Sequence, residues 1–172
     1  NGHALLTDFG LSKEGVLEVN KGAKSFCGSI AYLAPEMLRR VGHGKSVDWY
    51  LLGVLLYEML VGTPPYFSGN KEELFHNIIN GPLKLPRSIS QEAKSLMVSL
   101  LNRNPTRRLG AGPEGASEIM KHPFFANLDW KAVAKKEVPG LPLPRMRAED
   151  YNKQYPYSDF STKQINEIFD EE

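Results

Sequence analysis

The sequence is poor in the residues that build disulfide-bonded folds and metal centres. Its 172 residues include one cysteine, Cys27, and four histidines. A single thiol excludes an internal disulfide framework and a thiolate zinc site, so we expect an intracellular protein. The histidines show no i, i+4 pair, which argues against a metal site built on them. They are His3, His43, His76 and His122.

The chain also lacks an excess of charge of either sign. Charged residues make up 24% of the sequence and the formal net charge is +1. This balance gives no bulk attraction to nucleic acid or to an anionic membrane, so we expect neither as a partner. We see no signal peptide or other targeting stretch, and we therefore expect a cytoplasmic location without membrane insertion.

An initiator methionine and a first hairpin strand are missing as well. The chain opens on Asn1-Gly2, a pair typical of a hairpin turn, with no strand before it. We therefore expect this chain to be the second part of a larger protein.

The most prominent feature that is present is an apolar run over residues 47–61. It predicts a core helix over 46–62, with Ser46 as its N-cap and Gly62 just beyond its end. A helix that is apolar all round must be buried all round. The run is too short and too charged to cross a bilayer, which takes roughly 20 apolar residues, so the protein itself must bury it.

Two acidic residues interrupt the core helix. Asp48 lies in its first turn, where a carboxylate interacts favourably with the helix dipole. Glu58 lies deep in the apolar run and needs a cationic partner. Both residues therefore need an explanation beyond packing.

The remaining pattern predicts short elements joined by polar loops. The expected elements are a strand over 4–7, a mobile loop over 13–24, helices over 34–40, 71–79, 90–101 and 116–121, a short helix from Asp129, and an extended tail from Val138.

Several short motifs occur in a fixed order along the chain. They are Asp8-Phe9-Gly10, Ala34-Pro35-Glu36, Asp48-Trp49, Arg107-Arg108-Leu109-Gly110 and His122-Pro123-Phe124-Phe125. Together they resemble the second half of the protein kinase signature set. The chain is most similar to AGC serine/threonine kinases of the protein kinase B, S6 kinase and SGK group.

This resemblance implies a protein kinase-like fold, α+β overall. The chain would be its mainly α-helical C-terminal lobe, with a residual short strand and an extended tail. Residues 1–125 would be the C-lobe part of the catalytic domain, with the activation segment at 8–36. Residues 126–172 would form the AGC C-terminal tail.

The resemblance also implies a nucleotide site at the start of the chain. Asp8 matches the aspartate that holds Mg²⁺ on the phosphates of ATP, a role that needs an anionic oxygen ligand. Phe9 and Gly10 complete that motif, with Phe9 packing under the regulatory helix. ATP and Mg²⁺ are the expected cofactors.

Phosphorylation is the regulation that the resemblance implies. Ser25 matches the phosphoacceptor of the activation loop, and Lys13 matches a basic residue that pairs with the added phosphate. The expected activator is an upstream kinase of the phosphoinositide-dependent type.

Further matched residues face protein substrates. Ser29 matches the hydroxyl that bonds the catalytic aspartate, and residues from Gly28 to Leu33 match the pocket for the residue after the phosphoacceptor. Glu58 matches a glutamate that faces an arginine of the substrate. The alternative for Glu58 is an internal pair with a buried arginine.

Three matched residues hold the structure together. Asp48 matches the aspartate that accepts backbone N–H bonds from the catalytic loop. Glu36 and Arg108 match an ion pair that ties the activation segment to the later helices.

The glycine-rich loop, the ATP-binding lysine and the catalytic-loop aspartate of the family would lie before Asn1. We therefore expect activity only in the whole enzyme, and we expect preceding sequence to cover one face of the core helix. Without that cover, several of a set of apolar side chains should be partly exposed: Trp49, Leu52, Leu56, Tyr57 and Leu60.

Two alternatives remain open at the level of the sequence. A pseudokinase or scaffold would keep the fold for binding, and an unrelated helical module would have to reproduce the ordered motifs by chance. Ile30-Ala31 and Ser29 depart from the residues that are commoner in the family at these positions.

Overall fold

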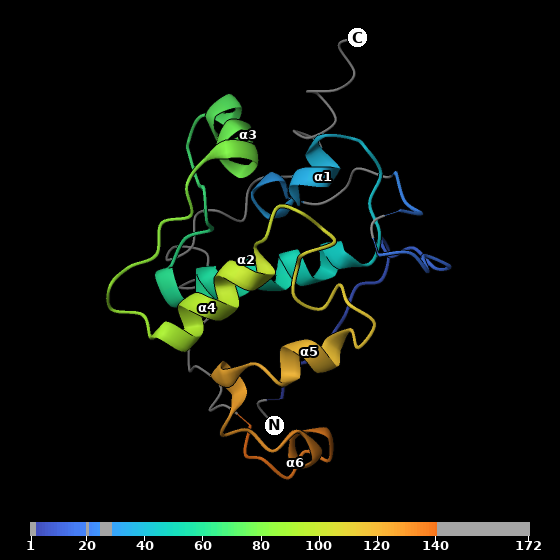
Figure 1. Ribbon diagram of the computed structural model, residues 1–172, viewed down its shortest axis with the longest axis vertical. Helices are drawn as coiled ribbons and strands as arrows, with labels where there is room; N and C mark the ends of the chain where they lie inside the picture. The colour runs from blue at the N-terminus through green and yellow to red at the C-terminus, as the bar shows by residue number, and fades with distance from the viewer. Residues whose placement is uncertain (1–2, 20, 25–28, 141–172) are drawn as a thin grey trace. The chain divides into compact units, whose positions relative to one another are not determined.

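The computed structural model describes residues 3–19, 21–24 and 29–140. Helices dominate this part of the chain (Figure 1). In chain order they are η1 (Ile30–Tyr32), α1 (Pro35–Leu38), α2 (Ser46–Val61), α3 (Lys71–Asn80), α4 (Gln91–Leu100), α5 (Ala116–Met120), η2 (Pro123–Phe125) and α6 (Trp130–Ala134).

β-structure is nearly absent from the described residues. It consists of one isolated antiparallel bridge, between Ala23 and His43. The strand predicted over 4–7 does not form, because no neighbouring segment among the described residues pairs with that backbone. The prediction of a mainly helical fold is confirmed, and the prediction of a strand over 4–7 is wrong.

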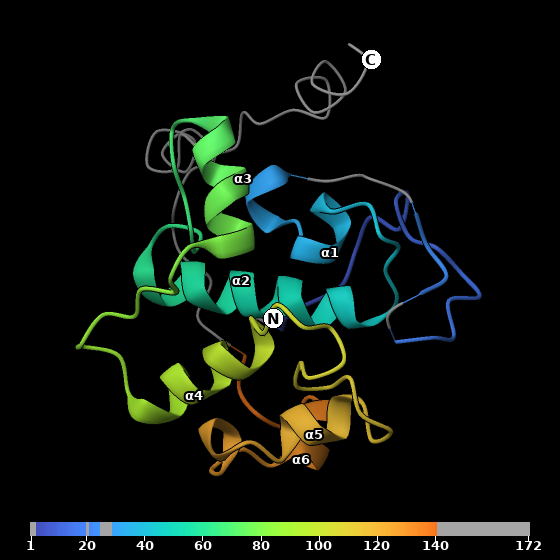
Figure 2. The ribbon, with the colours of Figure 1, turned by 45° about the horizontal axis from the view of Figure 1, so that its top comes forward.

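The chain divides into two compact units. Of the described residues, those from 13 to 126 form one, and residues 3–12 with 127–140 form the other. In the first unit, α2 runs through the middle, with α1 and α3 on one side and α4 and α5 on the other (Figure 2). In the second unit, the short helix predicted from Asp129 forms as α6, and the Asp129 carboxylate caps it by accepting from the N–H groups of Lys131 and Ala132.

The end of the core helix follows the prediction and its start does not. Gly62 adopts φ 90°, and its N–H donates to the carbonyl of Glu58 at 2.8 Å, which closes the last turn. Lys45 occupies the N-cap position, and Ser46 is the first helical residue. The Ser46 hydroxyl is buried without a hydrogen-bond partner, so the prediction that it caps the helix is wrong.

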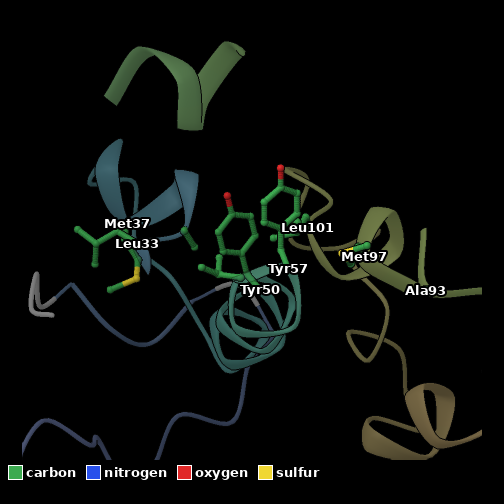
Figure 3. Packing of buried hydrophobic residues seen from close by; sticks show 9 residues of the cluster. Leu33, Met37, Tyr50, Tyr57, Ala93, Met97 and Leu101 are labelled. Atoms are coloured by element: carbon green, nitrogen blue, oxygen red, sulfur yellow. The ribbon is translucent and has the colours of Figure 1, made fainter. Parts of the chain in front are cut away.

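The core of the first unit is built on α2. Tyr50 and Tyr57 project from it among residues of α4 and of the segment that contains α1 (Figure 3), and Val54 belongs to the same cluster. Those partners are Leu33, Ala34, Met37, Ala93, Met97 and Leu101. At Gly53 a Cβ atom would lie 2.9 Å from the Cβ of Leu100, so α2 and α4 approach too closely there for a side chain.

One face of α2 is not covered. Leu52 is 36% exposed, Leu55 44% and Met59 66%. These three residues, which we call the α2 stripe, follow Asp48 at helical spacing, and Asp48 is exposed too. The prediction that α2 is buried all round is therefore wrong for this face.

The prediction that several of five apolar residues are partly exposed is confirmed. Leu52 and Leu60 are exposed, Trp49 and Leu56 are half-buried, and Tyr57 is buried. Tyr57 is the exception, and Leu55 and Met59, which were not among the five, are exposed as well.

Side chains cap two of the shorter helices. Asn70 accepts from the N–H of Glu73 at the start of α3, and Ser90 accepts from the N–H of Ala93 at the start of α4. The helix predicted over 34–40 ends earlier, at Leu38. None of the described helices combines the length and hydrophobicity that a bilayer crossing requires.

Candidate functional site

Asp8 lies in a tight turn of the second unit. Its backbone adopts φ 59°, a left-handed conformation that is uncommon outside glycine. Its Oδ1 atom accepts a long hydrogen bond of 3.4 Å from the N–H of Gly10. The Asp8 side chain is exposed, so its carboxylate keeps oxygen atoms available, and the ring of Phe9 is 63% exposed beside it.

This carboxylate suits Mg²⁺ only as a single protein ligand. The described residues contain no group of three or more His, Cys, Asp or Glu side chains that could hold a metal ion. Mg²⁺ is commonly held by one or two carboxylates together with phosphate oxygens and water. The donor chemistry at Asp8 therefore fits a magnesium ion that arrives with a nucleotide.

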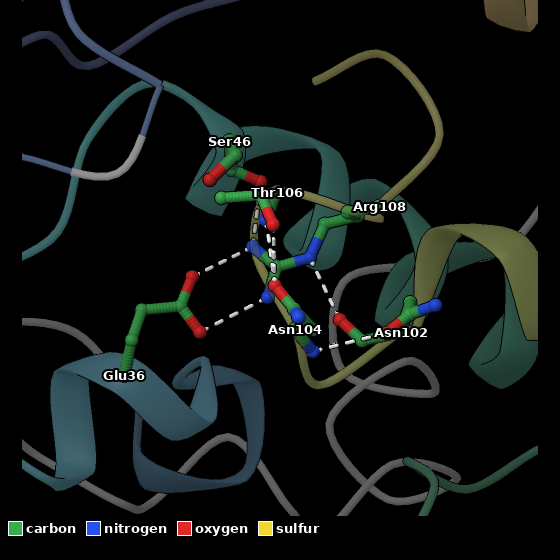
Figure 4. Close-up of polar contacts among 6 residues, drawn as sticks. All are labelled: Glu36, Ser46, Asn102, Asn104, Thr106 and Arg108. Carbon is green, nitrogen blue, oxygen red and sulfur yellow. Dashed lines mark hydrogen bonds and ion pairs between the residues drawn. The ribbon is translucent and has the colours of Figure 1, made fainter. Parts of the chain in front are cut away.

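The strongest electrostatic feature of the first unit is a buried ion pair (Figure 4). Both carboxylate oxygens of Glu36 accept from the guanidinium of Arg108, at 2.7 and 3.0 Å. Glu36 is 4% exposed and Arg108 is 2% exposed. The predicted pairing of these two residues is thus seen in the structure as a two-point contact, which fixes direction as well as distance.

Arg108 also donates to two backbone carbonyls. Its Nε atom donates to Asn102 at 3.0 Å, and Nη1 also donates to Ser46 at 2.9 Å. The guanidinium carbon lies 5.0 Å from the centre of the Tyr50 ring. One side chain therefore joins α1, the start of α2 and the segment after α4, and every charge in the pair is compensated.

Tyr50 packs beside this ion pair. Its hydroxyl is buried without a hydrogen-bond partner among the described residues. Burial raises the pKa of the Tyr50 hydroxyl, and the nearby Tyr66 adds to that shift. Tyr50 therefore stays neutral and does not compete with Glu36 for Arg108.

Glu58 has an aromatic hydroxyl as its partner. The hydroxyl of Tyr32, in η1, donates a hydrogen bond to Oε2 of Glu58 on α2. No cation pairs with Glu58 within the described residues, so both the expected cationic partner and the buried-arginine alternative are wrong for this part of the chain. The half-buried carboxylate is held at a fixed position beside η1.

The residues expected to contact substrate take different positions. Ser29 is half-buried and its backbone carbonyl accepts from the N–H of Tyr32 at 3.0 Å. Leu33 is 2% exposed and belongs to the core, where it packs rather than lining a surface. Ser25 and Gly28 lie outside the described residues, so their predicted roles stay predictions.

Asp48 and His43 meet at the start of α2. The backbone N–H of Asp48 donates to the carbonyl of Lys45 at 3.3 Å, whereas its carboxylate accepts no hydrogen bond within the described part of the chain. Partial desolvation raises the pKa of its carboxyl, and the nearby imidazole of His43 opposes this shift. His43 is buried, and burial lowers its pKa, with Glu36 acting in the opposite direction.

Sequence reasoning missed Arg103, which fixes the end of α3. Its guanidinium donates to three carbonyls at the helix C-terminus, those of Asn77, Ile78 and Gly81. It also lies 4.9 Å from the centre of the Tyr66 ring. A cation is favourable at a helix C-terminus, and the predicted end of the helix at residue 79 was the available signal that such a partner is needed.

Tyr32 was also missed as a single residue, although the stretch from Gly28 to Leu33 was assigned to substrate. No spacing rule links a tyrosine to a glutamate 26 positions away. A half-buried carboxylate that needs a donor was the only signal in the sequence.

Comparison with known proteins gives a consistent result. The family described as "Protein kinase domain" matches residues 1–125. The chain is 50% identical over 137 residues to "Protein kinase 2" of Dictyostelium discoideum, an alignment covering 80% of this chain and 28% of that protein. It is 48% identical over 138 residues to "Serine/threonine-protein kinase AtPK2/AtPK19" of Arabidopsis thaliana, covering 80% and 29%.

A human protein extends this series. "Ribosomal protein S6 kinase alpha-3" of Homo sapiens is 47% identical over 137 residues, which cover 80% of this chain and 18% of that kinase. The chain therefore spans less than a third of the length of these curated relatives. The family match and these identities agree with the ordered motifs, and the chain belongs to the protein kinase family, in its AGC serine/threonine branch.

Proposed function

We propose that this chain is the substrate-side lobe of a serine/threonine kinase that transfers the γ-phosphate of ATP to proteins near basic residues. The observation that carries the proposal is the carboxylate of Glu58. Tyr32 holds it in place, and no cation neutralises it within the described residues. A fixed carboxylate without a cation is suited to receive an arginine or lysine of a substrate.

The position of η1 supports this assignment. Tyr32 lies three residues after Ser29, in the stretch proposed to contact substrate. The Glu36–Arg108 pair follows directly and anchors that stretch to α2. We infer that the ion pair keeps the substrate-facing stretch and Glu58 in a constant arrangement, which is positioning rather than chemistry.

Asp8 is the residue that we assign to the nucleotide, with Phe9 and Gly10 completing its turn. When bound, ATP supplies the phosphoryl group and Mg²⁺ neutralises the charge on its phosphates. The role of Asp8 is to hold one metal position through an exposed carboxylate oxygen. Ser29 would bond a catalytic aspartate, and Asp48, whose carboxylate is open, would accept N–H groups of a catalytic loop.

The proposal also covers the regulation of the enzyme, its partners and its location in the cell. Phosphorylation of Ser25 by a kinase of the phosphoinositide-dependent type would create a dianion that pairs with Lys13. The other partners are protein substrates and the N-terminal lobe with its catalytic loop. Residues 126–172 are assigned to the C-terminal tail, and the location to the cytoplasm.

The test of the proposal is a change in substrate preference. A full-length Glu58→Gln enzyme keeps the hydrogen bond from Tyr32 but loses the charge that attracts arginine. We expect its kcat/KM for arginine-containing peptides to fall about tenfold or more, with little change for peptides that lack arginine. The measurement is the phosphorylation rate across a peptide library that varies the residues before the phosphoacceptor.

A matched control is Glu72→Gln, which removes an exposed carboxylate from α3. It should leave the arginine preference as it is in the wild type. If Glu58→Gln also keeps that preference, Glu58 does not read the substrate and the basic-residue part of the proposal is wrong.

A further inference from the structure

A pocket opens where the segment after α2 meets α3. Its volume is about 330 Å³, and residues of α2, of the connection to α3, of α3 itself and of the segment after α3 line it. We call it the α3 pocket. Ligand pockets start at roughly 300 Å³, so it has room for one large side chain.

Three aromatic rings and one carboxylate are prominent in the lining: those of Tyr57, Tyr66, Phe67 and Glu73. The Tyr57 hydroxyl donates to the carbonyl of Lys84 at 2.7 Å, which fixes the orientation of this ring. Glu73 is exposed, and its Oε2 atom accepts from the Ser68 hydroxyl at 2.7 Å. The ion pairs of the described residues do not include Glu73, so no cation neutralises its carboxylate there.

Arg103 holds two walls of the α3 pocket together. Its guanidinium donates to the carbonyls of Asn77 and Gly81, both of which line the pocket. The guanidinium carbon also lies 4.9 Å from the centre of the Tyr66 ring. Tyr66 adopts φ 68°, a left-handed conformation that is unusual for an aromatic residue. Such a conformation persists only where the surrounding contacts impose it, so the shape of the pocket is built into the fold.

The lining distinguishes between kinds of ligand. The faces of the aromatic rings and the carboxylate of Glu73 repel an anion. A purely apolar side chain would cover Glu73 and Asn77 without offering either a hydrogen bond. A guanidinium suits both features, because its plane stacks on aromatic rings and its N–H groups pair with a carboxylate.

Lys84 is the one lining residue whose charge opposes a bound cation. It is exposed and forms no ion pair with Glu73. The two charges therefore act separately on a ligand, and replacing one or the other should change the binding of a cation in opposite directions.

We propose that the α3 pocket binds an arginine side chain of protein substrates, distinct from the basic residue that Glu58 receives. This inference rests on the proposed function. Tyr57 directly precedes Glu58 on α2, so one helix carries a wall of the pocket and the carboxylate assigned to the substrate. A substrate with two arginines is then held at two points, which raises its affinity through a high effective concentration.

The first experiment measures binding without catalysis. The full-length protein is labelled with 3-fluorotyrosine, and N-acetyl-arginine methylamide is added while the fluorine resonance of Tyr66, identified by its loss in Tyr66→Phe, is followed. We expect a saturable shift, and weaker binding of the matching lysine compound, because an ammonium lacks the planar fork. Glu73→Gln should weaken the binding of the arginine compound about threefold to tenfold, and Lys84→Gln should strengthen it.

Glu72→Gln is the matched control. Glu72 is an exposed carboxylate next to Glu73 on α3 and does not line the pocket, so this variant should bind the arginine compound as the wild type does. A melting curve verifies that each variant is folded. Because the effects of Glu73→Gln and Lys84→Gln have opposite signs, a general loss of stability cannot produce both.

The second experiment measures phosphorylation of serine peptides with one arginine for Glu58 and a further arginine that is moved one position at a time along the peptide. We expect at least one placement of the further arginine to lower KM about threefold to tenfold, with kcat unchanged. Glu73→Gln should remove this gain in KM, and Glu72→Gln should keep it.

The two experiments fail in different ways. If the Tyr66 resonance shows no saturable shift, or if Glu73→Gln binds the arginine compound as tightly as the wild type, the pocket is not an arginine site. If the pocket binds the compound but no placement lowers KM, its role toward substrates is wrong. If the wild type phosphorylates none of the peptides, the proposed function fails, while the fluorine titration still decides whether the pocket binds arginine.

Discussion

At the scale of single residues, the Glu36–Arg108 pair does most to hold the site together. Its members lie 72 positions apart and are almost fully buried. Desolvating two charges is unfavourable, and here it is offset by two mutual hydrogen bonds and by the carbonyls of Ser46 and Asn102. Removing either partner leaves a buried charge without its counter-charge.

We predict that Glu36→Ala and Arg108→Ala each lower the free energy of unfolding by about 3 to 5 kcal/mol. The double variant should lose clearly less than the sum, because it leaves no isolated charge. The measurement is equilibrium unfolding in urea, monitored by circular dichroism, of the wild type, the two single variants and the double variant.

The exposed pair of Glu114 and Lys121 provides the control for this cycle. Its side chains are 55% and 67% exposed, and solvent screens their attraction. Its coupling should therefore lie below about 1 kcal/mol. If the loss in the double variant equals the sum of the two single losses, the coupling between Glu36 and Arg108 is as small as that of the exposed pair. The buried pair would then not act as a unit.

Prediction from the sequence succeeded for residues that carry a family motif. Glu36 and Arg108 were matched through their motifs, and the structure brings them together. Tyr32 and Arg103 were missed because their partners are a distant carboxylate and backbone carbonyls, which no local pattern identifies. The Ser46 cap was mispredicted because the backbone carbonyls of Glu18 and Val19 accept from the N–H groups of Lys45 and Ser46 at the start of α2.

At the scale of elements, α2 carries the clearest consequence of the sequence pattern. Its length and its glycine stop were predictable from the apolar run and Gly62. The position of its open face could not be predicted, because a helix that is apolar all round has no polar side to mark the exposed surface. The structure locates the open face at the α2 stripe.

An open apolar stripe predicts association of the isolated chain. Covering each large apolar side chain is worth up to roughly 1.5 to 3 kcal/mol, so several in a row favour contact between copies. We predict that residues 1–172 alone form oligomers, and that Leu55→Lys with Met59→Lys shifts them to monomers. Light scattering gives the mass, and circular dichroism verifies that the helices remain.

Val98→Lys is the control for this experiment. Val98 lies on α4 and is 53% exposed, between the values of Leu55 and Met59. Its replacement should leave the association unchanged. If the wild-type chain is monomeric, or if all variants associate equally, the α2 stripe does not drive association.

At the scale of the whole molecule, the chain supplies part of a kinase. The matched family region runs over residues 1–125, while the relatives are more than three times as long as the segment they share with this chain. Within the described residues, no group of three or more His, Cys, Asp or Glu side chains could hold a metal ion, and Asp8 is the exposed carboxylate that we propose for the nucleotide-bound metal. The ordered motifs predicted the family and the helical lobe. The backbone bridge between Ala23 and His43 depends on tertiary contacts that no motif encodes.

The central claim is that this lobe works in phosphoryl transfer through Asp8. The most direct measurement is the rate at which the full-length protein transfers phosphate from ATP to an arginine-containing serine peptide, for the wild type and for Asp8→Asn. We predict an active wild type and a loss in kcat of about a hundredfold or more in the variant, because a charge that stabilises the transition state is removed. An inactive wild type phosphorylated at Ser25, or an Asp8→Asn enzyme with undiminished kcat, would contradict the account.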